Sequence, residues 1–261
     1  MLIPNQPVGE LLRGWRRHRR VSQLDLAVQA GVSSRHISFL ETGRSRPSRQ
    51  MVLHLADQLE VPLRDRNTLL VAAGFAPEYA RTPLEDPGML AARAAIDLVL
   101  DGHAPYPALA VDRYWNILAA NSALGLLMTG VSPHLLEAPV NVLRVTLHPQ
   151  GVAPRIVNLS SLRQHLLVRL LRPIQITADP QLVDLHTELE SYPIPEHEPP
   201  EPHPFGDFAI PLQLESEHGI MSFISTITVF GGVHDLTLDE LAIESFYPAD
   251  EATARMFNSA D

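Results

Sequence analysis

The sequence predicts a chain of two domains, an all-α domain of five short helices followed by a mixed α/β domain. Capping residues and glycines recur at helix-length intervals near the N-terminus. Beyond residue 104, short stretches alternate apolar and polar side chains, as strands do. We expect the helical domain over residues 1–76, a linker and connecting helix over 77–104, and the α/β domain over 105–261.

Serines and glycines define the expected helices. Ser22, Ser33 and Ser48 precede apolar helical stripes and are good N-caps, and Gly31 and Gly43 are typical of helix ends. The helices that we expect are one around residues 11–15, then 23–30, 34–41, one that begins after Ser48, and 63–73.

The composition indicates a folded protein. Hydrophobic residues make up 45% of its 261 residues, and there is no cysteine, so disulfides and thiolate metal sites are excluded. The first residues lack the apolar run of a signal peptide, and no stretch is apolar enough to span a membrane. We therefore expect a soluble, cytoplasmic protein with no membrane association.

The charge is unevenly distributed. The formal net charge is -10, which by itself argues against a nucleic-acid ligand. Residues 1–50, however, contain nine arginines and three acids, a net charge of +6, while residues 51–261 contain eleven arginines and 27 acids, a net charge of −16. A basic N-terminal domain on an acidic body suits a module that binds phosphates.

The most specific motif is the stretch SQLDLAVQAGVSSRHISFLETGRSRPS, residues 22–48. Ala27 is small where two helices must approach, and Gly31 suits a turn with positive φ. Val32, Ile37 and Leu40 supply the apolar contacts that hold one helix across the other. This spacing predicts a helix-turn-helix, whose second helix enters the DNA major groove. Residues 9–74 resemble the phage Cro/repressor type, also called the XRE family, which implies a transcriptional regulator that binds double-stranded DNA.

The predicted DNA contacts lie on and around the third helix. If Ile37 and Leu40 face inward, the opposite face is free for bases, and an arginine there can hold guanine through two hydrogen bonds. By resemblance, Gln23 contacts the backbone or a base. Arg44 and Arg46 would hold phosphates. The alternative is that these are solvated surface residues only. The full set is Gln23, Ser33, Ser34, Arg35, His36, Ser38, Arg44 and Arg46.

Glu41 also lies on the third helix and has two interpretations. It can read a base, or it can pair with an arginine of the first helix, Arg13 or Arg16, and hold the domain together. We expect the ion pair.

The second domain has its own pattern. ALAVDRYWNILAAN predicts two short strands, residues 122–190 look helical, and seven prolines make residues 192–211 a loop. FAIPLQLE and IMSFISTITVF predict a strand pair joined by a turn, and a strand and a helix close the chain. Both faces of IMSFISTITVF are rather apolar, so we expect this strand to be covered on both sides.

Three stretches of this domain resemble the ligand-binding domain of MmyB-like transcription regulators, which is PAS-like. They are VDRYWNILAANSA (111–123), NVLRVTLHPQG (141–151) and TLDELAIESFYPADEAT (237–253). The resemblance implies a small-molecule pocket between a sheet and its helices.

The expected ligand is an apolar molecule with one polar end, for example a fatty acid, and no cofactor is required. Arg144, His148 or Asn121 could meet the polar end. Core packing is the alternative role for each apolar residue, and an internal ion pair is the alternative for Arg144. The apolar walls that we expect are Trp115, Leu124, Leu143 and Phe223.

Other chemistry has only weak signals. No HExxH, GxSxG or phosphate loop is present. His197 and His203 stand beside acids and could bind a metal, but a flexible loop is the simpler interpretation. Two carboxylates of one cluster could act as acid and base, although a solvated helix start explains them more simply. We therefore expect neither a metal site nor an enzyme. The cluster consists of Asp235, Asp239, Glu240 and Glu244.

We expect a homodimer that binds two DNA half-sites and senses a small effector. The alternative is a DNA-tethered interaction protein whose second domain binds a protein partner or only dimerises. A third hypothesis, an enzyme with a DNA-binding domain, has no signature in the sequence.

Overall fold

Contacts within the chain divide it into two units. The computed structural model describes residues 6–177, 179–194, 210–230 and 235–258. The first unit, which we call the helical unit, contains the described residues up to 82 together with 235–239. The second, which we call the sheet unit, contains the remaining described residues.

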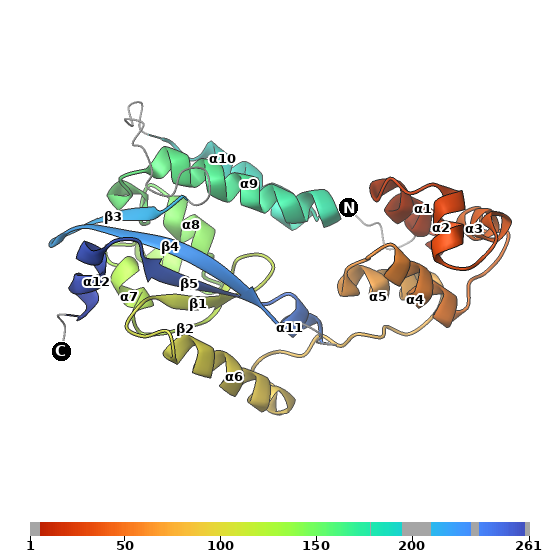
Figure 1. Cartoon of the computed structure of the whole chain (residues 1–261), viewed down its shortest axis with the longest axis horizontal. Helices are drawn as coiled ribbons and strands as arrows, with labels where there is room; N and C mark the ends of the chain where they lie inside the picture. Colours follow the sequence, from red (N-terminus) through yellow and green to blue (C-terminus); the bar gives the residue numbers. More distant parts are fainter. Residues whose placement is uncertain (1–5, 178, 195–209, 231–234, 259–261) are drawn as a thin grey trace. The chain divides into compact units, whose positions relative to one another are not determined.

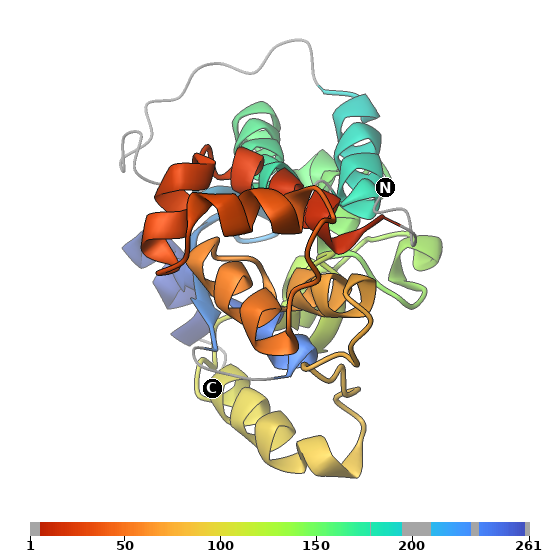
Figure 2. The same cartoon turned by 90° about the vertical axis from the view of Figure 1, so that its right-hand side faces the viewer.

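The helical unit has the five short helices that the sequence predicts (Figure 2). Each predicted N-cap serine accepts a hydrogen bond from the backbone N–H three residues further on, at Ser22, Ser33 and Ser48. Gly31 and Gly43 have φ of +64° and +71°, which side chains disfavour, so both glycines end helices as expected. The helices are α1 (Val8–His18), α2 (Gln23–Gln29), α3 (Ser34–Glu41), α4 (Arg49–Gln58) and α5 (Leu63–Ala72).

A tightly packed interior holds these helices together. Leu26, Ile37 and Leu40 are each 1% exposed, so the inner face of α3 packs against α2 as the motif predicts. α1 and α3 approach most closely at Gly9, where an added Cβ would lie 2.3 Å from the carbonyl oxygen of Leu40. Only glycine fits this position without a shift of one helix.

A segment from far along the sequence completes the helical unit. The short helix α11 (Leu236–Asp239) lies between two strands of the sheet unit in sequence, but it packs on α5. Leu236 is 5% exposed and donates its backbone N–H to the carbonyl oxygen of Ala80 at 2.8 Å. Asp235 accepts the backbone N–H of Thr82 at 3.2 Å. The sequence did not predict this attachment.

The sheet unit is the predicted mixed α/β domain. It is built on one five-stranded antiparallel sheet with the order β2-β1-β5-β4-β3. The expected strand pair is the hairpin of β3 and β4, and the expected closing strand is β5. The strands are β1 (Ala108–Val111), β2 (Ile117–Ala120), β3 (Leu212–Ser216), β4 (Gly219–Val229) and β5 (Ala242–Pro248).

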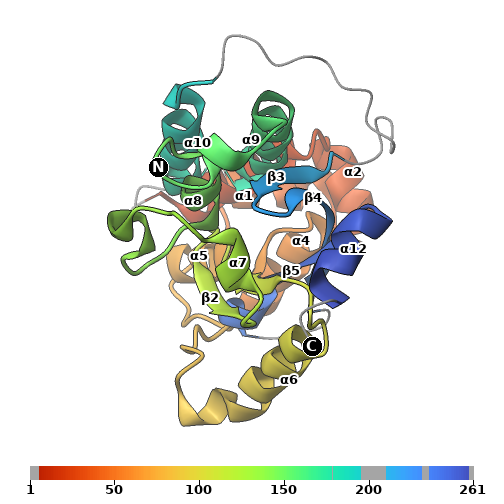
Figure 3. The same cartoon turned by 90° about the vertical axis from the view of Figure 1, so that its left-hand side faces the viewer.

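Helices surround this sheet (Figures 1 and 3). One core joins the side chains of β1, β3, β4 and β5 to those of α7 to α10, while α6 packs beside β1 and β2. α9 and α10 pack against each other. The helices are α6 (Leu90–Asp101), α7 (Leu124–Leu127), α8 (Val142–Leu147), α9 (Leu159–Thr177), α10 (Pro180–Ser191) and α12 (Glu251–Asn258).

Strand register decides which side chains of the sheet face α8 and α9. Ser225 of β4 lies opposite Phe246 of β5, and Ile227 lies opposite Glu244. Because alternate residues of a strand share a face, Phe223, Ser225, Glu244 and Phe246 all point to the same side.

Two expectations about these strands were wrong. β4 is not covered on both sides along its length, because residues 225–229 are exposed while Met221 and Phe223 are buried. β4 has 11 residues, and its second half extends beyond the elements that bury its first half. Glu244 does not belong to a solvated helix start: it lies in β5 and is 7% exposed.

Candidate functional site

The outer face of α3 is the candidate DNA-binding surface. Ser34 and Arg35 are exposed, whereas Ile37, Leu40 and Glu41 are buried, which is the orientation that we expect for a recognition helix. The other predicted contacts differ in exposure: Ser33, Arg44 and Arg46 are exposed, and His36 and Ser38 are partly exposed. The hydroxyl of Ser33 already accepts the backbone N–H of His36 at 3.1 Å, so it also caps the helix.

An aromatic ring supports the arginines of this surface. Arg35 and Arg44 both lie over the ring of Phe39, at 5.1 and 5.7 Å from its centroid. The backbone N–H of Ser45 donates to the carbonyl oxygen of Phe39, which ties the loop after α3 to the helix. A ring beneath two guanidinium groups limits their rotation, so they meet a ligand partly ordered. Sequence reasoning missed this role of Phe39.

A closed ion pair lies behind α3. Arg16 donates from Nε and Nη2 to the two carboxylate oxygens of Glu41, at 2.5 and 2.9 Å. This is the pair that the sequence predicts. Gln23, a predicted DNA contact, donates to Glu41 at 2.8 Å and therefore serves this network in the structure. Burial by itself would raise the pKa of Glu41, but the hydrogen bonds from Arg16 and Gln23 outweigh it and lower that pKa.

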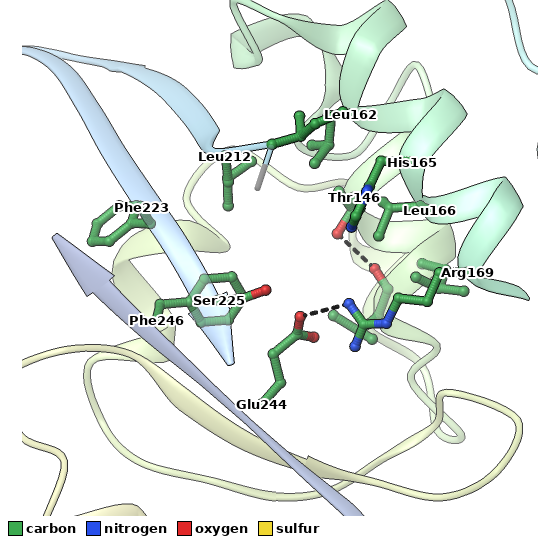
Figure 4. Close-up of a pocket in the computed structure, with 13 residues that line it drawn as sticks. Thr146, Leu162, His165, Leu166, Arg169, Leu212, Phe223, Ser225, Glu244 and Phe246 are labelled. Atoms are coloured by element: carbon green, nitrogen blue, oxygen red, sulfur yellow. Dashed lines mark hydrogen bonds and ion pairs between the residues drawn. The ribbon is translucent and has the colours of Figure 1, made fainter. Parts of the chain in front are cut away.

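A cavity opens between the sheet and helices α8 and α9 (Figure 4). It encloses about 50 Å³. Its apolar wall comes mainly from Leu162 and Leu166 of α9 and from Phe223 and Phe246 of the sheet, with Leu143 of α8. A second cavity of about 30 Å³ shares residues of α8, β3 and β5 with the first.

One edge of the main cavity is polar. His165 and Arg169 lie one turn apart on α9, and Ser225 and Glu244 lie on the facing strands (Figure 4). Arg169 Nη1 donates to Glu244 Oε1 at 3.1 Å. Burial lowers the pKa of His165, the charge of Arg169 lowers it further, and the charge of Glu244 opposes both. His165 is therefore uncharged near neutral pH.

Trp115 lies under this polar edge. Its ring is 4.3 Å from the guanidinium carbon of Arg169. Trp115 has φ of +66°, an unusual value for a bulky residue, and its loop is held by Asp112, which accepts the backbone N–H groups of Tyr114 and Asn116. The loop positions Trp115, and Trp115 in turn positions Arg169.

Only some of the residues predicted to bind a ligand line a cavity in the structure. Leu143 and Phe223 line the main cavity, and Leu124 lines the second. Trp115 acts through Arg169, as described. The three predicted polar contacts line neither cavity.

Each of these three polar side chains has partners within the protein. Asn121 accepts from Ala108 N and donates to the carbonyl oxygens of Leu100 and Tyr106. Arg144 forms an ion pair with Glu188 at 2.7 Å, the alternative that the sequence left open. His148 accepts the backbone N–H of Gln150 and packs on the ring of Tyr192. A ligand role for these residues remains a prediction that the geometry does not favour.

Sequence reasoning missed most of the polar edge of the cavity. His165 and Arg169 follow Leu162 and Leu166 at helical spacing, so two polar residues interrupt an apolar stripe. Glu244 lies between two apolar residues and a phenylalanine in a strand-like run. Both patterns are present in the sequence. Only the register of β5 against β4, however, places Glu244 beside the two polar residues of α9.

The geometry defines a helix-turn-helix unit and a second unit with a cavity between its sheet and helices. Comparison with known families agrees: residues 7–69 match a helix-turn-helix domain. Residues 92–260, more than half of the chain, match the MmyB-like transcription regulator ligand binding domain. The chain therefore belongs to the family of MmyB-like transcription regulators.

Relatives from two mycobacterial species belong to the same class of protein. Uncharacterized HTH-type transcriptional regulators of Mycobacterium bovis and Mycobacterium tuberculosis are each 34% identical to the chain over 102 residues. The match covers 39% of this chain and 40% of each relative, so it spans about two fifths of their length.

The described part of the chain offers neither a membrane-spanning helix nor a cluster of metal-ligating side chains. None of its helices is long and apolar enough to cross a membrane. None of its histidines and acids cluster as a metal site. His197 and His203 lie outside the described residues.

Proposed function

We propose that this protein binds a specific DNA operator as a homodimer and changes its affinity for that operator when the sheet unit binds a small, largely apolar molecule. The observation that carries the DNA half is the outward face of α3, with Arg35 exposed above Phe39. The observation that carries the sensing half is the cavity beneath α9, which combines apolar walls with a few polar groups, as ligand sites do. Such a regulator would act in the cytoplasm, beside the DNA.

The exposed face of α6 supports the dimer. Leu90 and Leu98 stand two turns apart on this helix and are 69% and 74% exposed, with Ala94 between them. An apolar stripe of this kind favours contact with another helix. We propose a second copy of the chain as the partner, because two helix-turn-helix units then meet two half-sites.

The same stripe favours one other function, a DNA-tethered protein that binds another protein through α6. Native mass spectrometry of the purified protein distinguishes the two. A dimer that carries a small-molecule mass, lost on denaturation, supports the regulator. A monomer without added mass supports the interaction protein.

The experiment for DNA binding compares two arginines. Arg35→Ala should weaken binding to the operator by about 1–3 kcal/mol, since it removes a base contact. Arg46→Ala should weaken binding to all sequences alike and reduce the salt dependence, since it removes a phosphate contact. Equilibrium binding at several salt concentrations, on operator and scrambled DNA, measures both. Unchanged affinity in both variants would refute this orientation of α3.

The segment of residues 235–239 is our proposed path from ligand to DNA. It packs in the helical unit, while β4 and β5 on either side of it carry Ser225 and Glu244 of the cavity. A ligand that shifts these strands therefore pulls on a segment that is bonded to Ala80 and Thr82. Coupling requires such a difference between the two states.

Asp235→Ala tests this path, because Asp235 accepts from Thr82 and caps α11. Ligand binding and operator binding should each persist, while the effect of ligand on operator affinity should fall at least severalfold. Asp250→Ala is the matched control, because Asp250 caps α12 within the sheet unit. Equal loss of coupling in both variants would refute the path.

A further inference from the structure

The cavity carries charged groups, but these groups cancel each other. Arg169 and Glu244 are paired at 3.1 Å, and both line the cavity. The other polar groups in the lining are His165, which is uncharged near neutral pH, and the hydroxyls of Ser225 and Thr146. The lining, as far as the structure describes it, therefore has no net formal charge to neutralise a charged ligand.

A carboxylate in this cavity would meet a carboxylate. Glu244 is 7% exposed and faces the cavity from β5, so its charge is poorly screened by water. Arg169, the only cation among the described residues of the lining, already neutralises Glu244. Two anions that share one guanidinium repel each other at short range, and burial strengthens that repulsion. An anionic ligand is therefore disfavoured.

An uncharged polar group suits the same edge. Among the described residues, Arg169 Nη2 is buried and has no hydrogen-bond partner, so the guanidinium retains a donor. A buried donor without an acceptor is costly, and a ligand oxygen that reaches Nη2 after a small movement of the guanidinium would relieve that cost. A carbonyl oxygen supplies this acceptor without adding charge. The hydroxyl of Ser225 and the ring of His165 offer further hydrogen bonds at the same edge.

The rest of the ligand has to be apolar and short. The second cavity shares Val142, Thr146, Leu212 and Phe246 with the first. Its remaining lining is apolar and includes side chains of α7. The two cavities enclose about 50 and 30 Å³, so a long chain does not fit without rearrangement, and these volumes favour a molecule with a short tail.

We propose that the cavity binds an uncharged amphiphile, a short apolar molecule with a carbonyl-type acceptor that meets the Arg169–Glu244 pair, and that it rejects the corresponding carboxylate. This inference rests on the proposed ligand-sensing function and names the ligand class. The proposed ligand is uncharged and therefore differs from the fatty acid that the sequence led us to expect.

Hexanamide and hexanoate test this inference, because they share a chain length and differ in charge. Isothermal titration of the full chain at pH 7.5 should show hexanamide binding at least about tenfold more tightly than hexanoate. Glu244→Gln removes the competing charge with little change in shape, so it should narrow or reverse this preference. Leu166→Phe, which fills the cavity, should weaken hexanamide binding.

Glu188→Gln is the matched control. It also breaks an Arg–Glu pair of the sheet unit, that with Arg144, but this pair lines neither cavity. Glu188→Gln should prefer hexanamide over hexanoate by the same factor as the wild type.

Three results would overturn the inference: equal or tighter binding of hexanoate, the same change of preference in Glu188→Gln, or no binding of hexanamide at millimolar concentration. Operator affinity and the ligand mass found in native spectra test the proposed function separately. A bound anion would therefore leave ligand sensing intact while refuting the uncharged class.

Discussion

Two arginine–glutamate pairs, one in each unit, show how the same chemistry serves different purposes. In the helical unit, Arg16 and Glu41 meet through two hydrogen bonds of 2.5 and 2.9 Å, and Gln23 donates a third. In the sheet unit, Arg169 and Glu244 meet through one hydrogen bond of 3.1 Å at the edge of a cavity.

The difference between the pairs lies in what remains unsatisfied. The guanidinium of Arg16 also donates to the carbonyl oxygen of Val21, so the pair has partners on every side and locks α1 to α3. Arg169 Nη2 has no partner among the described residues. A complete pair stabilises a fold, whereas an incomplete one beside free space is suited to binding.

The largest expected effect is on the complete pair. Glu41→Ala leaves Arg16 buried without its partner and should cost about 3–5 kcal/mol of unfolding free energy. Glu244→Ala should cost only about 1–2 kcal/mol, because Arg169 loses one hydrogen bond of 3.1 Å and keeps its contact with the ring of Trp115.

Fluorescence can assign these costs to each unit, since the chain has two tryptophans, Trp15 in the helical unit and Trp115 in the sheet unit. Urea unfolding of Glu41→Ala in a Trp115→Phe background follows the helical unit alone. Glu244→Ala in a Trp15→Phe background follows the sheet unit. Equal costs would remove the distinction between the pairs.

A smaller effect tests the close approach that the complete pair holds. Gly9→Ala places a Cβ at 2.3 Å from the carbonyl oxygen of Leu40, so α1 must move off α3, at a cost of about 1–3 kcal/mol. Gly14→Ala in the same helix meets no atom within 4 Å and should stabilise the unit by up to about 1 kcal/mol. Thermal unfolding of both variants checks the opposite signs, and a loss at both positions would contradict the packing.

The smallest effect is a difference in acid sensitivity. Because the folded pKa of Glu41 is lowered, its contribution to stability is present above the unfolded pKa, about 4.3, and is lost as the pH falls through the folded value. Glu41→Gln should flatten the dependence of helical-unit stability on pH in this range. Parallel profiles for the variant and the wild type, measured by urea unfolding at several pH values, would show that Glu41 is not the titrating group.

Local signals explain how far prediction reached in each unit. In the helical unit, caps, positive-φ glycines and apolar spacing act within a few residues, so Ser33, Gly31 and the inward side of α3 were readable. The pairing of Glu41 with Arg16 was also predictable, because the two residues lie on short, adjacent helices of the same domain. The incorporation of residues 235–239 was not, because no local pattern reveals a contact across more than 150 residues of sequence.

The sequence by itself determined the order of helices and strands, the outward orientation of Arg35 on α3, and the regulator family, because these depend on short-range spacing and composition. The tertiary structure alone decided the cavity. Arg169 and Glu244 are 75 residues apart and meet only because β5 pairs with β4 in one register while α9 packs over both strands. A shift of one residue would turn Glu244 to the other face, so long-range pairing, which no local preference encodes, assembles the polar edge of the cavity.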